Sequence, residues 1–214
     1  MLRVKICGIS SLEEAEWAVE AGADALGFVF APGSKRYVEP CRVREITAQL
    51  PPFIARVGVF VDSSPAEVRE IITSCGLTVI QLHGDENPED YRELALPILK
   101  AVRFELDEEE AAGGHLGNWI KSVQGIVLDA AYGGNFGGTG RALPWHDQAL
   151  QGLCQEIARN KTPLILAGGL NPNNIQTAVA KVRPYAVDVS SGVESAGRKQ
   201  RELIRAFVTQ AKNC

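Results

Sequence analysis

The sequence lacks the cysteine pairs that would build a disulfide framework or a structural zinc site. It has five cysteines, an odd number with no CxxC pair, at positions 7, 41, 75, 154 and 214. Its three histidines, at positions 83, 115 and 146, are too scattered for a readable metal motif. Both observations argue against disulfide-rich and zinc-dependent classes of protein.

Long hydrophobic runs are missing as well. No apolar stretch approaches the roughly 18 residues that a membrane-spanning helix needs. Residues 1–6 are charged too early to resemble a secretory signal peptide. We therefore expect a cytoplasmic protein that does not associate with membranes.

The sequence also has no excess of positive charge. It carries 22 Lys and Arg against 26 Asp and Glu, for a net charge of −4, and only three tryptophans. Without a basic cluster, nucleic acid is not an expected partner. A small anionic substrate stays compatible with this charge, because a local nest of backbone N–H groups can bind an anion.

What the sequence does contain is a regular alternation of strand-like and helix-like segments. Short apolar runs rich in β-branched residues cover 4–7, 25–30, 57–61, 79–82, 98–104, 126–128, 164–166 and 186–189. Because strands that alternate with helices must be joined by crossovers, the pattern predicts a parallel sheet. Eight units in 214 residues indicate an α/β fold, a compact (β/α)8 TIM barrel with one domain over residues 1–214.

The helix-like segments carry start signals and apolar stripes. Ser11 and Glu14 form the sequence pattern of a capping box, and Asn171 followed by Pro172 predicts a helix start. The fifth helix is interrupted by glycines 113 and 114. The sixth and eighth helices have stripes at helical spacing: Leu150, Leu153, Cys154 and Ile157, then Ile204, Phe207, Val208 and Ala211. No GxGxxG follows the first strand and no GxxxxGK[ST] occurs, which argues against a nucleotide-binding sheet.

In barrels of this class, the active site forms where the strands end, and Cys7 and Asp129 stand at two such ends. Cys7 could be an ordinary buried cysteine, and Asp129 could be a structural carboxylate. Lys5 shares the face of Cys7, so its ammonium would favour the thiolate if both point inward. Facing each other across the mouth, Cys7 and Asp129 would serve as a base and an acid.

The first and last strands become neighbours when the barrel closes. Lys5 and Asp188 have the same parity as Cys7 and Ser190 on those strands. We therefore expect a buried ion pair between Lys5 and Asp188 beneath the active site.

Other polar residues at strand ends are candidates for binding a substrate. Arg36 follows the second strand and is either solvated or suited to bidentate recognition of a carboxylate. Gln81 and His83 end the fourth strand, and Arg103 lies near the end of the fifth. For His83 alone, a hydrogen-bonded interior position is favoured over catalysis.

Glycine-rich ends predict a phosphate site. Gly168 and Gly169 follow the seventh strand, and Ser191 and Gly192 follow the eighth, where such barrels commonly bind phosphate through backbone N–H groups. Ordinary tight turns are the alternative. A second glycine-rich segment, residues 133–140 with Gly138 and Gly140, reads either as a lid closing on phosphate or as a flexible connector.

These residues together resemble phosphoribosylanthranilate isomerase of tryptophan biosynthesis. The resemblance spans nearly the whole chain and departs at Ala130-Ala131, where a hydroxyl residue is often found, and at Ala196-Gly197, where Pro-Gly is usual. The matching motifs are Lys5-Ile6-Cys7-Gly8-Ile9, Gly27-Phe28-Val29-Phe30, Ser34-Lys35-Arg36-Tyr37, Gly58-Val59-Phe60, Gln81-Leu82-His83-Gly84, Asp129, Phe136-Gly137-Gly138-Thr139-Gly140, Leu166-Ala167-Gly168-Gly169-Leu170 and the stretch from Asp188 to Glu194.

The resemblance implies an Amadori rearrangement of N-(5′-phosphoribosyl)anthranilate to an open-chain deoxyribulose phosphate. It implies Asp129 as the general acid that opens the ring and Cys7 as the base that removes the C2′ proton. Arg36 would hold the anthranilate carboxylate, and the seventh and eighth loops would hold the phosphate. It implies no metal or organic cofactor, and we expect a monomer whose partner is this phosphorylated small-molecule substrate.

Two alternatives remain at this point. A histidine-pathway isomerase performs the same rearrangement on a related barrel, but resembles a two-aspartate arrangement, whereas Cys7 occupies the first position here. A phosphate-binding barrel kept as a scaffold or regulator is the non-enzymatic alternative. The presence of Cys7, Arg36 and Asp129 together disfavours it.

The absence of a metal or dinucleotide motif yields a first prediction. Activity should survive exhaustive chelation and dialysis, because proton transfers alone suffice for the rearrangement. Turnover, followed by the fluorescence of the anthranilate substrate before and after treatment, is the measurement. A loss of turnover that a divalent ion restores would contradict the prediction.

Overall fold

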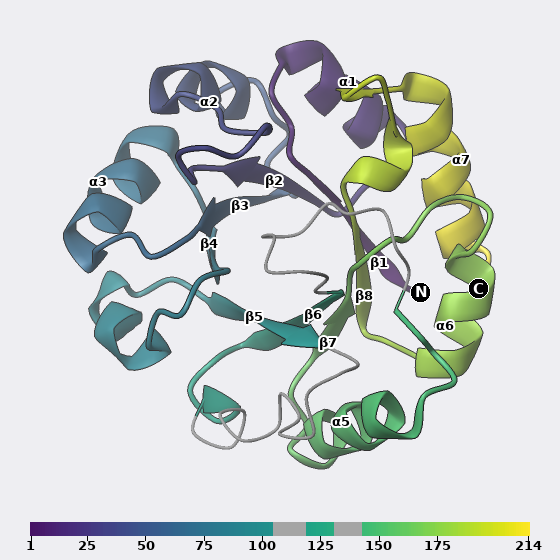
Figure 1. Cartoon of the computed structure of the whole chain (residues 1–214). Helices are drawn as coiled ribbons and strands as arrows, with labels where there is room; N and C mark the ends of the chain where they lie inside the picture. Colours follow the sequence, from purple (N-terminus) through teal and green to yellow (C-terminus); the bar gives the residue numbers. More distant parts are fainter. Residues whose placement is uncertain (105–118, 131–142) are drawn as a thin grey trace.

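Eight parallel strands close into a barrel in the order of the sequence (Figure 1). The computed structural model describes residues 1–104, 119–130 and 143–214. The strands are β1 (Arg3–Cys7), β2 (Ala25–Val29), β3 (Ala55–Phe60), β4 (Val79–Leu82), β5 (Ile98–Phe104), β6 (Gly125–Ala130), β7 (Leu164–Leu166) and β8 (Ala186–Val189). Every strand predicted from the sequence is confirmed, with ends that agree within two residues.

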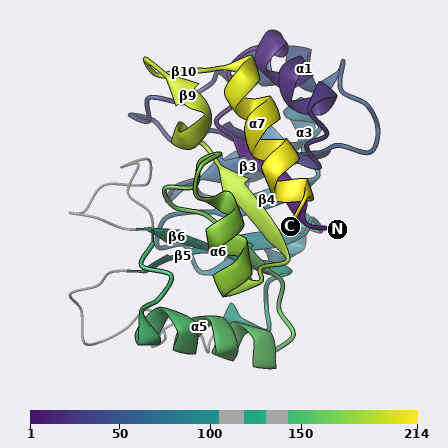
Figure 2. The same ribbon diagram turned by 90° about the vertical axis from the view of Figure 1, so that its right-hand side faces the viewer.

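Helices form the outer ring around this barrel (Figures 1 and 2). They are α1 (Leu12–Glu20), α2 (Pro40–Thr47), α3 (Pro65–Cys75), the 3-10 helix η1 (Pro88–Leu94), α5 (Gln148–Arg159), α6 (Ile175–Val182) and α7 (Arg201–Lys212). After β8 the chain makes a short 3-10 helix, η2 (Ser191–Val193), and a hairpin of β9 (Glu194–Ser195) and β10 (Arg198–Lys199). No helix in the described part of the chain is both long and apolar enough to cross a membrane.

The predicted helix start at Ser11 is confirmed with an incomplete capping box, and the predicted start at Asn171 is wrong. The Ser11 side chain accepts from the Glu14 N–H, but the Glu14 carboxylate binds the N–H of Ser10, so the capping box is not reciprocal. Helix α6 begins at Ile175, because Asn171 instead forms a turn in which its side chain accepts from the Asn173 N–H at 2.9 Å. The interruption at residues 113 and 114 lies outside the described residues.

The main hydrophobic core lies between the barrel and the helices. Helix α7 shows how it forms, because its apolar stripe is fully buried: Ile204, Phe207, Val208 and Ala211. Burying each large side chain of this kind contributes about 1.5–3 kcal/mol. The stripe on α5, also predicted from the sequence, is buried in the same way.

The barrel interior is filled differently. Its apolar residues form two separate clusters, one at the ends of β1 to β3 around Cys7 and Val59, and one on β5 to β8 around Val127 and Ile165. Polar side chains occupy the rest of the inward-facing positions that the sequence marked as candidates. The interior therefore combines two apolar clusters with buried polar side chains such as Lys5, Gln81 and Asp188.

The predicted ion pair between Lys5 and Asp188 is confirmed. The two residues are register partners on β1 and β8, and Lys5 Nζ lies 2.7 Å from Asp188 Oδ2. Their side chains are only 5% and 7% exposed. Burial lowers the pKa of Lys5, but Asp188 and Cys7 together outweigh it and raise that pKa above its ordinary value.

Removing one member of this pair should be costly. We expect Lys5→Met to lower the free energy of unfolding by about 3–5 kcal/mol, because it leaves the Asp188 charge buried without its partner. Urea titration followed by circular dichroism measures the loss. Arg201→Met is the matched control, since it breaks the exposed pair with Glu20 (2.9 Å) and should cost less than about 1 kcal/mol. Equal losses in the two variants would refute the prediction.

Candidate active site

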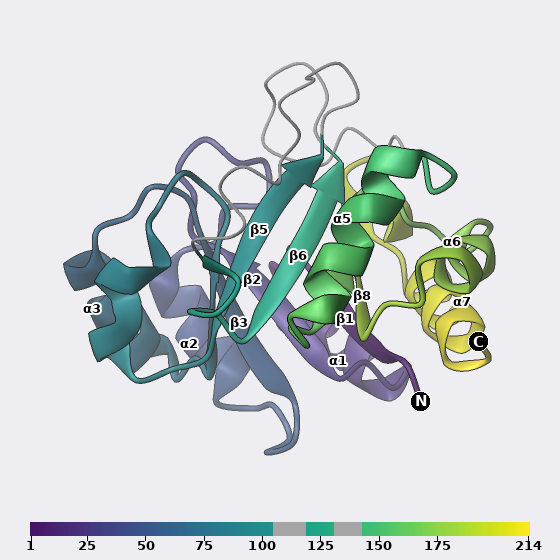
Figure 3. The same ribbon diagram turned by 90° about the horizontal axis from the view of Figure 1, so that it is seen from below.

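The predicted site residues gather at the carboxyl end of the barrel. In Figure 3 the arrowheads of β5 and β6 mark this end, and the two chain termini lie toward the other. Cys7 ends β1, His83 follows β4, and Arg103 and Asp129 are register partners on β5 and β6. Arg36 comes from the loop after β2. Five elements that are distant in sequence thus contribute to one mouth.

Cys7 lies just above the Lys5–Asp188 pair and is 9% exposed. Burial raises the pKa of the Cys7 thiol above its ordinary value. The Lys5 ammonium lowers it, as expected from the sequence, but does not offset burial, and the Asp188 carboxylate adds to the rise. Lys5 therefore acts in the expected direction, but burial and Asp188 together keep the pKa of the thiol above its ordinary value.

Asp129 is paired with His83. The His83 Nε2 atom lies 3.3 Å from Asp129 Oδ2, and the side chains are 15% and 12% exposed. On the other side of the ring, Gln81 Nε2 lies 3.1 Å from His83 Nδ1. Gln81 is itself 1% exposed, so the imidazole is held between a buried amide and a carboxylate. The predicted residues Gln81, His83 and Asp129 are thus brought together in one chain of contacts.

Arg103 supports this group through the main chain. Its Nη2 donates to the backbone carbonyl of His83 at 3.0 Å. Because Arg103 and Asp129 are register partners, the guanidinium comes from the strand next to the carboxylate. Arg103 therefore borders the mouth, as the sequence predicted.

Arg36 is engaged by a carboxylate of the chain itself. Its Nε and Nη2 atoms donate to the two carboxylate oxygens of Glu194, each at 2.8 Å. Glu194 also accepts from Lys199 Nζ at 2.7 Å. Burial opposes ionisation of Glu194, but these hydrogen bonds lower its pKa to about 2. Both N–H groups of Nη1 and the second N–H of Nη2 bond to no residue that the structure describes, so this edge of the Arg36 guanidinium is left for another partner.

The loops after β7 and β8 approach each other closely. Gly168 and Gly169 have φ of +78° and +64°, the left-handed region that favours glycine. Neither of their N–H groups bonds to any residue that the structure describes. A Cβ on Gly192 would clash with the carbonyl oxygen of Leu170, so only glycine lets the two loops meet. Unpaired N–H groups on tightly turned backbone are typical of an anion site.

Two further residues at the mouth, Glu194 and Lys199, were not predicted from the sequence. Glu194 closes the last motif of the resemblance, but nothing in that motif indicates its partner. Lys199 stands in the run Arg198-Lys199-Gln200-Arg201, which reads as a solvated basic stretch. The Lys199 side chain is nevertheless 1% exposed, because the hairpin of β9 and β10 folds it inward.

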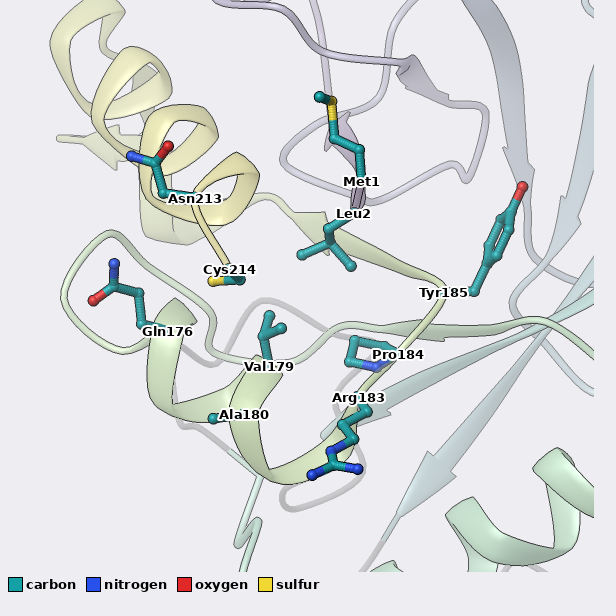
Figure 4. A pocket seen from close by; sticks show the side chains of 10 residues that line it. All are labelled: Met1, Leu2, Gln176, Val179, Ala180, Arg183, Pro184, Tyr185, Asn213 and Cys214. Atoms are coloured by element: carbon teal, nitrogen blue, oxygen red, sulfur yellow. The ribbon is translucent and has the colours of Figure 1, made fainter.

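Two of the predicted binding residues, Gly138 and Gly140, lie outside the described residues. Among residues 1–104, 119–130 and 143–214, no group of three or more His, Cys, Asp or Glu side chains is placed to hold a metal ion. A surface hollow of about 630 Å³ lies next to the starts of β1 and β8 (Figure 4). Cys7 and Asp129 stand at or near the carboxyl ends of their strands and therefore at the other end of the barrel. The lining of the hollow includes Leu2, Val179 and Tyr185 and contains no acid–base pair.

A buried thiol, a carboxylate beside an imidazole and unpaired backbone N–H groups thus meet at the mouth of a (β/α)8 barrel, where enzymes of this fold have their active sites. Over residues 4–210 the chain matches the family model described as N-(5'phosphoribosyl)anthranilate (PRA) isomerase. The chain belongs to this family and is an isomerase.

Named relatives agree with this assignment. The N-(5'-phosphoribosyl)anthranilate isomerase of Desulfitobacterium hafniense strain Y51 is 48% identical, and the alignment covers 99% of this chain and 98% of the relative. The crystal structure of phosphoribosyl anthranilate isomerase from Thermotoga maritima has a TM-score of 0.84 and 40% identity, with complete coverage of both chains. A structure of the isomerase with reduced 1-(o-carboxyphenylamino)-1-deoxyribulose 5-phosphate has a TM-score of 0.81 and 38% identity, also with complete coverage of both chains.

The close approach at Gly192 gives a prediction. Gly192→Ala should push the loops after β7 and β8 apart, raise KM about tenfold and change kcat less, because the lost contacts bind substrate and transition state alike. Steady-state kinetics measures both constants. Gly152→Ala is the control, since a Cβ there meets nothing within 4 Å and alanine favours helix α5. An unchanged KM in Gly192→Ala would contradict the anion site.

Proposed function

We propose that Cys7 and Asp129 perform the two proton transfers by which this isomerase converts N-(5′-phosphoribosyl)anthranilate to 1-(2-carboxyphenylamino)-1-deoxyribulose 5-phosphate in tryptophan biosynthesis. The observation that carries the proposal is the position of both side chains. Each is buried on an inward-facing position at the carboxyl end of its strand, where barrels of this class perform their chemistry.

The first transfer opens the sugar ring. Asp129 gives a proton to the furanose oxygen as the bond from that oxygen to C1′ breaks. The nitrogen lone pair forms a C=N bond to C1′, so the open chain is a protonated Schiff base. A carboxyl group held by His83 at 3.3 Å has a fixed direction for this transfer.

The second transfer forms the enolamine. The Cys7 thiolate takes the C2′ proton, and the electrons of that bond form a double bond between C1′ and C2′. Proton movement from the 2′-hydroxyl and onto C1′ then gives the ketone. Because the pKa of Cys7 is raised, the fraction of thiolate, and with it the rate of this step, increases with pH up to that raised pKa. A thiolate of raised pKa is also a stronger base for a carbon acid.

Lys5 supports Cys7 from below. Its ammonium is adjacent in the barrel interior and lowers the pKa of the thiol, against the effect of burial. Because Asp188 holds Lys5 at 2.7 Å, the ammonium stays fixed while the thiol changes charge. Lys5 is therefore a positioning and electrostatic residue in this proposal, and it does not exchange the proton itself.

The phosphate and the anthranilate carboxylate of the substrate would bind to different groups of the protein. The loops after β7 and β8 would take the phosphate through the N–H groups of Gly168 and Gly169, with Ser191 and Gly192 beside them. Arg36 would take the anthranilate carboxylate through the edge formed by Nη1 and the second N–H of Nη2, since Glu194 already occupies Nε and the first N–H of Nη2. Glu194 would then hold the Arg36 guanidinium in the orientation that binds this carboxylate.

The family assignment decides against the two alternatives left by the sequence, the histidine-pathway isomerase and the non-enzymatic scaffold. We also propose a single domain, a monomeric state and a cytoplasmic location. These three proposals rest on the sequence, and a relative from Thermotoga maritima is described as dimeric. Light scattering after gel filtration tests the monomer.

Variants at the two residues should fail at different steps. Cys7→Ala and Asp129→Asn should each lower kcat by about 10²–10⁴-fold, the usual contribution of a general acid or base. Cys7→Ser should be almost as poor, because a serine hydroxyl ionises far less readily than a thiol. Binding of the reduced product analogue should persist in all three.

The diagnostic substrate is an acyclic imine whose 4′-oxygen carries a methyl group, so that it cannot form the ring. It bypasses the first transfer and should rescue Asp129→Asn but not Cys7→Ala. With the normal substrate deuterated at C2′, a primary isotope effect should appear wherever the second transfer limits the rate. Near-normal turnover in Cys7→Ala would remove Cys7 from the reaction.

A further inference from the structure

The interior next to Asp129 contains a second titratable group that the proposed reaction leaves without a task. His83 lies between Asp129 Oδ2 (3.3 Å) and the buried amide of Gln81 (3.1 Å). Carboxyl groups in general are almost fully ionised at neutral pH, whereas an imidazole titrates close to it. A general acid that acts at neutral pH therefore benefits from a partner that can hold its proton between turnovers.

We propose that His83 and Asp129 share one proton and act as a single acid, with His83 as the reservoir that reloads Asp129 and Gln81 as the residue that orients the imidazole. This inference rests on the proposed role of Asp129. The pair exists either as imidazolium with carboxylate or as imidazole with carboxylic acid. The two forms differ only in which side of the 3.3 Å contact holds the proton.

Gln81 fits both protonation states of the ring. A primary amide presents a donor and an acceptor on one carbon, and half a turn exchanges them. With Nε2 toward the ring, the amide donates to a bare Nδ1. With the amide turned, Oε1 accepts from a protonated Nδ1. In the present orientation Gln81 Oε1 is buried and bonds to no residue that the structure describes, so the turned orientation gives this oxygen a partner.

The other charged groups around His83 are already engaged. From the loop after β3, Asp62 accepts from the Asp85 N–H at 2.8 Å. Glu86 binds the backbone N–H of Asp62 and of Gly84 and pairs with the buried ammonium of Lys100 at 3.1 Å.

From β5, Arg103 donates to the backbone carbonyl of His83. Among the described residues, Asp129 is the one carboxylate that forms an ion pair with the imidazole of His83. The ring therefore exchanges its proton with Asp129 rather than with Asp62 or Glu86.

The proton balance closes over one turnover. Ring opening takes one proton from the pair to the sugar oxygen and leaves imidazole with carboxylate. The pair recovers one proton when the 2′-hydroxyl of the enolamine becomes the product ketone. Cys7 meanwhile moves a proton from C2′ to C1′, so no further reactant is required.

His83→Gln is the decisive variant. The glutamine amide nitrogen reaches the position of His83 Nε2 and keeps an N–H donor beside Asp129, but it cannot titrate. We expect kcat to fall about tenfold to 100-fold, with little change in KM or in the affinity for the reduced product analogue. The alkaline limb of the kcat profile should move to lower pH, because a carboxyl group alone loses its proton at lower pH than an imidazole pair.

The acyclic imine distinguishes a role of His83 in ring opening from a purely structural role of this residue. If His83 supplies the proton for ring opening, the imine should rescue His83→Gln as it rescues Asp129→Asn. The control is His146→Gln, an exposed histidine before α5, which should keep the wild-type kcat and pH profile. An unchanged kcat and alkaline limb in His83→Gln would overturn the proposal while leaving Asp129 as the acid. Full activity in Asp129→Asn would instead overturn the proposed function itself.

A measurement on the intact wild-type enzyme covers the case in which a variant folds poorly. The ring ¹⁵N resonances of His83, followed by NMR with ¹⁵N-labelled histidine, report which nitrogen carries a proton. They should change over the same pH range as the alkaline limb of kcat. Ring resonances that stay constant across that range would overturn the shared-proton pair.

Discussion

The ion pair between Lys5 and Asp188 is the constraint on which the site depends. Neither charge could remain in the barrel interior alone, because burying an unpaired charge is far more costly than burying a pair. The pair forms only when β1 and β8 lie in the observed register. Two residues further along each strand stand Cys7 and Ser190, and Ser190 Oγ donates to the Cys7 carbonyl at 3.0 Å. The position of the thiol therefore follows from the closure of the barrel.

A second ionic group organises the rim. Glu194 joins Arg36, from the loop after β2, to Lys199 on the hairpin after β8. The turn of that hairpin contains Ala196 and Gly197 with φ of +49° and +76°, as in two-residue hairpin turns of the primed type. A proline at 196, usual in the family that the sequence resembles, could not adopt this φ. The replacement of the usual Pro-Gly by Ala196-Gly197 thus goes with a specific backbone turn. The contact between Glu194 and Lys199 is present with this turn.

The sequence predicted the fold and the inward-facing residues because both depend on simple periodicities. Alternation along a strand placed Lys5 and Cys7 on one face, and the order of strands made Lys5 and Asp188 neighbours. The raised pKa of the Cys7 thiol and the partner of Arg36 were not predictable in this way. The first depends on the balance between burial and two nearby charges, and the second on a carboxylate 158 positions away in the chain. The contact of His83 with Asp129 likewise joins strands β4 and β6, which are not neighbours in the sheet.

The contacts that complete the mouth join the two ends of the chain, since the Lys5–Asp188 and Cys7–Ser190 bonds each span 183 positions. A chain emerging from the ribosome presents β1 long before β8 exists. Until then the Lys5 ammonium has no carboxylate to bind, and a partial barrel leaves the open edges of β1 and of the last strand made without partners. Contacts of such high sequence separation slow folding, because the entropy of loop closure must be overcome before they form. The environment of the Cys7 thiol is therefore complete only after β8 has been made and has paired with β1.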